Sequence, residues 1–173
     1  DIAHWGLGLE RSAPVEIQGK GVYPLEGIYD VPVEYDITCR YENGLTIRVA
    51  NRSRLTHGQG VTWYGDNGWI HVNRGSCYAS NENILQEKIR DDEIRLYRSN
   101  DHYQNFLDCI KSGKEPVAPV DIAHRSVSVA LLGEIAMQTE KKLKWDSEKE
   151  KFTNSKIANR MLDRPYRKGY KRI

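Results

Sequence analysis

A change in hydrophobic period along the chain constrains its fold more than any other feature of the sequence. Over residues 31–39 and 45–49 apolar and polar residues alternate, and the turn residues Tyr41-Glu42-Asn43-Gly44 and Asp66-Asn67-Gly68 mark two tight turns. This pattern predicts two antiparallel hairpins. From residue 99 to 141 the apolar residues instead recur every three to four positions, which is typical of helices. The sequence therefore predicts an α+β fold, a mostly antiparallel open-faced β-sheet with two or three helices packed on one face.

Capping residues delimit the two main helices. Ser99, Asn100 or Asp101 is expected to cap the first helix, which begins near Asn100 and runs to about Ser112, with Gly113 as its stop. The second is expected to be the longest helix, over 122–141, with Asp121 as its N-cap. Its centre is apolar on nearly all sides, which indicates a helix packed against the sheet. Two small residues at its centre allow a close approach to the sheet: Ala130 and Gly133.

Composition and simple motifs exclude several classes of function. Lys plus Arg number 26 and Asp plus Glu number 24, so the chain is not built as a strong nucleic-acid or membrane binder. No apolar run approaches the ~20 residues that a membrane helix needs. The chain has neither a Walker loop nor a GxGxxG sequence, and no two histidines have metal-ligand spacing, so neither a dinucleotide site nor a metal site is predicted. The three cysteines contain no CxxC pair and predict reduced, buried thiols.

Three residues near the starts of the two main helices are candidate ligand-binding residues. His102 falls in the first turn of the first helix, and His124 and Arg125 fall in the first turn of the second. Helix N-termini present free N–H groups and the positive end of the helix dipole, so hydroxyls and anions often bind there. A structural interpretation stays open, in which His102 is a surface residue and Arg125 pairs with Asp121.

Two further patterns suggest other functions. The aromatic hairpin around Trp63 and Trp69 would suit a stand-alone carbohydrate-binding module, although ordinary sheet packing explains it too. The C-terminal tail interleaves basic residues with tyrosines, a pattern that can bind phosphates of nucleic acid. Because the rest of the chain balances this charge, a solvated or interface tail is the better interpretation. The basic residues of the tail are Arg164, Arg167, Lys168, Lys171 and Arg172.

The stretch from Ser99 to Asp146 carries a resemblance to a known family. It contains, in order, HYQNFLDCIKSG, a P-x-x-P link, AHRS at the start of a long Ala/Leu helix, and a WD strand. This order resembles the C-terminal domain of the Gfo/Idh/MocA oxidoreductases, and most of all their Bacteroidetes-type branch. The ending NRMLDRPYRKGY and the opening DIAHWGLG resemble the same branch, so the resemblance covers almost the whole chain.

The resemblance implies a division of labour within a longer protein. The family has an N-terminal Rossmann domain that binds NAD or NADP, followed by an α+β domain. Residues 1–173 are expected to be a single domain equivalent to that second one, and the Rossmann domain is expected upstream of Asp1. The family's D-x-x-x-H motif and catalytic Lys would also lie upstream. No catalytic residue and no bound cofactor are therefore expected in this chain, which is expected to be inactive alone.

The activity that the resemblance implies for the full-length parent is hydride transfer from a sugar, polyol or glycoside to nicotinamide. An NAD-dependent glycosidase variant, which cleaves glycosides through transient oxidation, is a second form of it. This domain would supply substrate binding, with His102, His124 and Arg125 near the substrate or the domain interface. Its open sheet face is expected to carry apolar side chains and to bind further copies of the chain. The expected partners are these copies and a sugar-like small molecule, without nucleic acid or membrane, in a soluble cytoplasmic or periplasmic protein.

Overall fold

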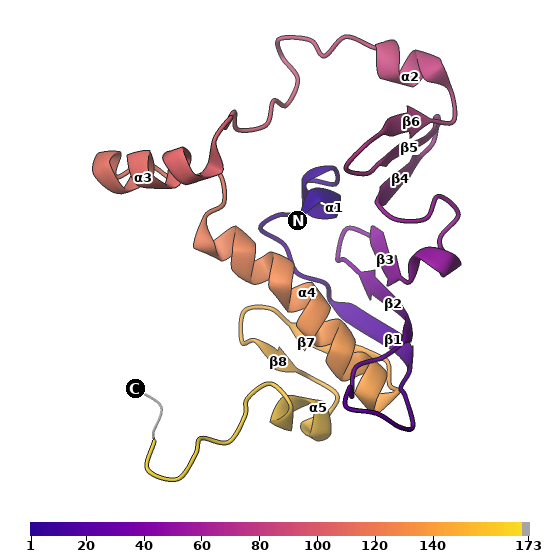
Figure 1. The fold of residues 1–173 in the computed structure, drawn as a ribbon, viewed down its shortest axis with the longest axis vertical. Coiled ribbons are helices and arrows are strands. Elements are labelled where there is room, and N and C mark those ends of the chain that lie inside the picture. The colour runs from indigo at the N-terminus through magenta and orange to yellow at the C-terminus, as the bar shows by residue number, and fades with distance from the viewer. Residues whose placement is uncertain (171–173) are drawn as a thin grey trace. The chain divides into compact units, whose positions relative to one another are not determined.

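The computed structural model describes residues 1–170, and Figure 1 shows their fold. The chain forms helices and two antiparallel sheets, so the predicted α+β class is confirmed. It groups into two compact units, one of residues 1–11 and 59–126 and the other of residues 12–58 and 127 onward. Two basic residues of the C-terminal tail, Lys171 and Arg172, lie outside the described residues.

A five-stranded antiparallel sheet forms the centre of the second unit. Its strand order is β3-β2-β1-β7-β8, so the two segments that make up this unit meet where β1 pairs with β7. Tyr41 and Gly44 close the turn of the first predicted hairpin, and Gly44 has the positive φ of 86° that favours glycine. The strands are β1 (Glu16–Val22), β2 (Glu34–Arg40), β3 (Thr46–Ala50), β7 (Leu143–Asp146) and β8 (Lys151–Phe152).

Helix α4 (Val120–Thr139) lies along one face of this sheet (Figure 1). A Cβ atom at Gly133 would lie 2.8 Å from Cδ1 of Ile37, and one at Gly19 would lie 2.8 Å from Cγ of Met137. These close approaches confirm that Gly133 lets the helix pack tightly, whereas Ala130 is exposed and takes no part in this contact. The buried apolar side chains of this unit include Ile17, Ile37, Cys39, Leu132, Ile135, Ala136, Leu143 and Phe152.

The start of α4 corrects one prediction. The helix begins at Val120, and its first hydrogen bond runs from the Ala123 N–H to the Pro119 carbonyl, so Asp121 is not the N-cap. Asp121 instead lies inside the first turn, where a carboxylate is favoured by the helix dipole. Proline tolerates this position because its missing N–H is not needed there. Asp121 accepts a hydrogen bond from the Arg11 guanidinium, which also lies 3.1 Å from Glu115.

The face of the five-stranded sheet that α4 leaves uncovered is polar. Alternate positions of β1, β2 and β3 place Lys20, Asp36 and Arg48 there, beside a groove of about 890 Å³. Arg48 donates two hydrogen bonds to Asp36 at 2.9 and 2.6 Å, and this contact holds the pKa of that carboxyl below its usual value. The prediction that this face carries an apolar patch is therefore wrong, because its strand positions are filled mainly by charged and hydroxyl side chains.

The other unit contains a three-stranded antiparallel sheet of order β4-β5-β6. The predicted second hairpin is confirmed, with β4 and β5 joined by Asp66-Asn67 and Gly68 as the first residue of β5. It belongs to a separate sheet because the chain leaves extended structure over residues 51–60, where Gly58 and Gly60 both have positive φ. Its strands are β4 (Val61–Gly65), β5 (Gly68–Val72) and β6 (Cys77–Ala79), and its helices are α1 (Ile2–Trp5), α2 (Glu82–Gln86) and α3 (His102–Ser112). The remaining helices lie in the second unit: a short 3-10 helix (Arg52–Arg54) and α5 (Lys156–Arg160).

All three cysteines are free, as predicted, but they are not all buried. Cys39 lies in the core of the five-stranded sheet, and burial raises the pKa of its thiol to about 12. A thiol with that pKa stays protonated and unreactive near neutral pH. Cys77 is exposed and Cys109 is half-buried, so the prediction of buried thiols is wrong for Cys77. Cys77 is exposed because it lies in β6, a short edge strand whose side chains are mostly exposed.

Replacement of Glu140, directly after α4, by glycine should stabilise the protein. The Glu140 φ of 51° lies in the left-handed region that side chains disfavour, and the Glu140 N–H caps the helix by bonding the Met137 carbonyl. Glu140→Gly is expected to raise the free energy of unfolding by about 0.5–1 kcal/mol, measured by urea denaturation. Lys141→Gly is the control, because Lys141 has no positive φ and glycine there should only destabilise. Equal destabilisation by both changes would contradict the argument.

Candidate functional site

The residues around His102 form a capped helix start, as predicted. Asp101 is the N-cap of α3, and its carboxylate accepts a hydrogen bond of 2.9 Å from the Gln104 N–H. Gly113 ends the helix in the left-handed conformation, with φ 69°. His102 is the first residue of α3 and is exposed, so its imidazole is accessible to a ligand or a partner.

Helix α3 has no buried residue of its own. Phe106 and Ile110, on its apolar stripe, are 58% and 65% exposed. A helix of this length is marginal in water without packing. Its position within its unit therefore depends on polar contacts at its ends and on whatever covers the stripe.

A shallow groove of about 360 Å³ begins at His102. One side is the first turn of α3, with Tyr103, Asn105 and Phe106, and the other is the loop Pro116–Ala118. Its lining is mostly apolar, and the side chains in it that carry polar groups are those of His102, Tyr103 and Asn105. The volume lies at the lower end of the range of small-molecule pockets. Asn105 was not singled out as a candidate from the sequence, although its place three residues after His102 on a helix puts both on one side.

The other two candidates lie at the start of α4. His124 is exposed and Arg125 is half-buried, both within the same unit as His102. The carboxylate of Asp121 accepts a hydrogen bond from Arg11. Within the described residues, neither His124 nor Arg125 belongs to the lining of the groove at His102. That His124 and Arg125 act together with His102 stays a prediction.

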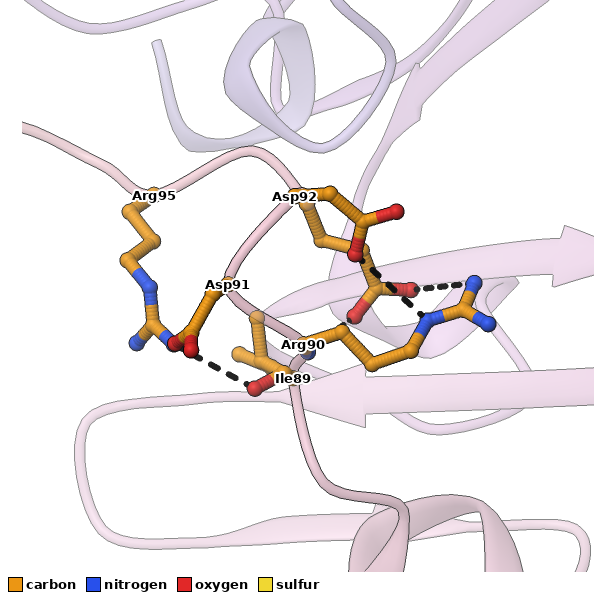
Figure 2. Close-up of polar contacts among 6 residues, drawn as sticks. Ile89, Arg90, Asp91, Asp92 and Arg95 are labelled. Atoms are coloured by element: carbon orange, nitrogen blue, oxygen red, sulfur yellow. Dashed lines mark hydrogen bonds and ion pairs between the residues drawn. The ribbon is translucent and has the colours of Figure 1, made fainter.

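The segment that leads into α3 contains several ion pairs between residues close together in the sequence. Figure 2 shows the Arg90 guanidinium beside Asp92, and Arg95 beside Asp91 and Ile89. Arg95 donates to the Ile89 carbonyl at 3.3 Å, and the Arg90 carbonyl accepts a hydrogen bond of 3.2 Å from a backbone N–H three residues on. These contacts close a small loop, but all its charged members are exposed, so each ion pair contributes little to stability.

The aromatic hairpin is used largely for packing. The Trp63 ring lies against Gly6, where an added Cβ would come within 2.2 Å of its Nε1, and that Nε1 donates to the Ala3 carbonyl at 3.4 Å. Trp69 contacts Tyr78 edge-to-face, with ring centroids 5.8 Å apart. Tyr64, on the opposite face from Trp63 as its position in the strand predicts, is 69% exposed. Of the three aromatic rings in β4 and β5, those of Trp63 and Trp69 are therefore half-buried and that of Tyr64 is exposed.

Two other kinds of feature are absent from residues 1–170. No group of three His, Cys, Asp or Glu side chains there is arranged to hold a metal ion. No helix in that range combines the length and apolar character of a bilayer-spanning segment.

Comparison with known proteins identifies the family. A family model described as the C-terminal alpha/beta domain of an oxidoreductase family, Gfo/Idh/MocA, matches residues 10–172. The comparison with curated proteins finds no significant match. The family match leaves out only residues 1–9 at the N-terminal end of the described chain and includes the α3 and α4 starts that carry His102, His124 and Arg125. The chain therefore belongs to the Gfo/Idh/MocA oxidoreductase family, of which it is a C-terminal α/β domain.

Proposed function

We propose that this chain is the substrate-binding domain of an NAD(P)-dependent oxidoreductase that acts on a sugar, polyol or glycoside. The observation that carries the proposal is the family match over residues 10–172. Two features of the structure support it. His102 is exposed at the edge of a small groove, and His124 is exposed near the start of the next helix. Exposed imidazoles suit the exchange of protons and hydrogen bonds with substrate hydroxyls near neutral pH.

The cofactor belongs, in this proposal, to a Rossmann domain that precedes this one. The described residues, 1–170, do not fit a dinucleotide, because no Gly-rich loop among them joins a strand to the N-terminus of a helix. A nicotinamide supplies hydride chemistry when it is bound elsewhere in the protein. This domain's part is to bind and orient the substrate, with His102, His124 and Arg125 facing it or the domain boundary. Arg125 would fix a substrate oxygen or pair with an acidic residue across that boundary.

Association between copies is the second part of the proposal. The uncovered sheet face carries Lys20, Asp36 and Arg48, so a contact there would be polar, with matched charges rather than an apolar core. The Asp36–Arg48 pair shows that opposite charges on this face already lie within bonding distance. Sedimentation equilibrium at tens of micromolar should report a dimer or larger assembly that weakens as salt is raised. A monomer at every concentration and ionic strength would contradict the proposed association between copies.

Cofactor titration tests whether the cofactor site lies outside this chain. The isolated chain is expected to give no saturable change in nicotinamide fluorescence with NADH or NADPH, because it lacks a phosphate-binding loop. The product of the full reading frame, titrated in the same way, is the positive control. Saturation of the isolated chain at micromolar cofactor would place the cofactor site in this domain and contradict the proposal.

Substitution of the two histidines tests the substrate site. In the full-length enzyme, His102→Ala and His124→Ala are each expected to lower kcat/KM at least tenfold, a loss of about 1.4 kcal/mol in transition-state stabilisation. Both side chains are exposed, so Tm should hardly change. Lys111→Ala, at the far end of α3, is the matched control and should leave kcat/KM unaltered. If neither histidine variant differs from the Lys111 control, the substrate-site assignment is wrong.

A further inference from the structure

Asn105 uses both ends of its side-chain amide to join three parts of the chain. Its Nδ2 donates a hydrogen bond of 2.8 Å to the Tyr97 hydroxyl, which precedes α3. Its Oδ1 accepts a hydrogen bond of 3.0 Å from the Val117 N–H, which follows α3. The bond between Val117 and Asn105 is partly buried. Loss of the Asn105 oxygen would therefore leave the Val117 N–H without an acceptor. Asn105 therefore ties the first turn of α3 to the chain on both sides of the helix.

No comparable contact fixes the start of this helix within the described residues. The neighbouring Gln104 donates to Asp108 on the same helix, so that bond leaves the orientation of α3 unaffected. Cys109 lies 3.6 Å from the Glu115 carbonyl, but a thiol is a weak donor and this contact is two turns from the helix start. Since no residue of α3 is buried, apolar packing within its unit does not hold the first turn either.

We propose that Asn105 is a positioning residue that holds His102 in its working orientation. Asn105 lies three residues after His102, so both project from the same side of the first turn, and both line the groove formed with Pro116–Ala118. By bonding the Val117 N–H, Asn105 fixes the distance between the imidazole and the opposite wall of that groove. The inference rests on the proposed role of His102, which Asn105 serves without itself contacting the reacting atoms.

Amide hydrogen exchange on this chain tests the geometry without any assumption about activity. Asn105→Leu keeps the side-chain size but removes both hydrogen bonds, and the Val117 amide is expected to exchange at least about tenfold faster. Asn105→Asp retains an acceptor for the Val117 N–H and for the Tyr97 O–H, so exchange should stay near the wild-type rate. Tyr97→Phe removes one bond only and should lie between the two. Gln104→Ala is the matched control on the same helix and should not affect Val117.

Kinetics of the full-length enzyme test the functional consequence. Asn105→Leu is expected to lower kcat/KM about tenfold, as His102→Ala does, and Asn105→Asp is expected to restore it to within about threefold of wild type. Gln104→Ala should have no effect. If Val117 exchange is unchanged in Asn105→Leu, or if His102→Ala lowers kcat/KM and Asn105→Leu does not, the positioning role alone is wrong. If His102→Ala is itself silent, the proposed substrate site fails, and this inference fails with it.

Discussion

Replacing Gly60 by alanine is expected to lower the free energy of unfolding by about 3 kcal/mol or more. Gly60 has a φ of 137°, which side chains rarely adopt, and an added Cβ would lie 2.4 Å from the Val72 carbonyl oxygen. The same Cβ would lie 2.7 Å from the His71 ring, which is only 1% exposed and is held by a 2.8 Å contact between its Nδ1 and the Thr62 hydroxyl. Neither the β5 backbone nor that ring is free to move away without disrupting the β4–β5 pairing.

Gly58→Ala is the control for backbone strain alone. Gly58 lies two residues away with a φ of 73°, and nothing lies within 4 Å of the position that its Cβ would take. Gly58→Ala should therefore lower the free energy of unfolding only by the cost of the left-handed conformation, about 1 kcal/mol. Chemical denaturation followed by circular dichroism measures both changes. Equal losses in the two variants would show that the contact with Val72 and His71 relaxes freely, against the prediction.

Gly133→Leu is expected to have the second largest effect, a loss of about 3 kcal/mol in the free energy of unfolding. Even a Cβ at this position would lie 2.8 Å from Cδ1 and 3.1 Å from Cγ2 of Ile37, which is 5% exposed in the core. A longer side chain has to push α4 away from β2, and the gain in helix propensity over glycine, about 1 kcal/mol, does not offset this. Ala130→Leu, on the exposed side of the same helix, should change stability by less than about 0.5 kcal/mol.

A double-mutant cycle shows whether the loss comes from this contact. Ile37→Ala alone leaves a cavity and should cost about 2–4 kcal/mol. In the Gly133→Leu background the same truncation makes room for the leucine, so it should cost clearly less. Urea denaturation of the four proteins gives the coupling energy. Additive losses would mean that Gly133 and Ile37 act independently, and that the close helix–sheet approach does not depend on this glycine.

The hairpins and helix ends were predictable because local chemistry encodes them. The turns at Asn43-Gly44 and at Asp66-Asn67-Gly68 reverse the chain through local chemistry, and the alternating residues beside each turn favour a pair of strands. Asp101 and Gly113 delimit α3 through hydrogen bonds to backbone groups a few residues away. The same local reasoning gave a wrong N-cap at Asp121. The Pro119 carbonyl accepts the first helical hydrogen bond, and Arg11, distant in the sequence, binds the Asp121 carboxylate.

Part of the candidate site could be predicted from the sequence, and part of it required the tertiary structure. A helix start at His102 follows from the sequence, and so does a family resemblance that the match over residues 10–172 confirms. The role of Asn105 does not, because its partners Tyr97 and Val117 lie 8 and 12 residues away along the chain, on opposite sides of the helix. Amide side chains bond in so many ways that spacing alone does not select these two groups.

The sequence by itself determined the two hairpins, the two main helices, the α+β class and the family, since each depends on short-range patterns or on their order along the chain. Only the tertiary structure decided how the strands divide between two sheets, and that β7 pairs with β1 across more than a hundred residues. It also decided which face of α4 meets Ile37, leaving Ala130 exposed, and that the uncovered sheet face is polar. The physical reason is that burial and hydrogen bonding between distant segments are settled by competition among all possible partners, and that competition is resolved only when the whole chain is folded.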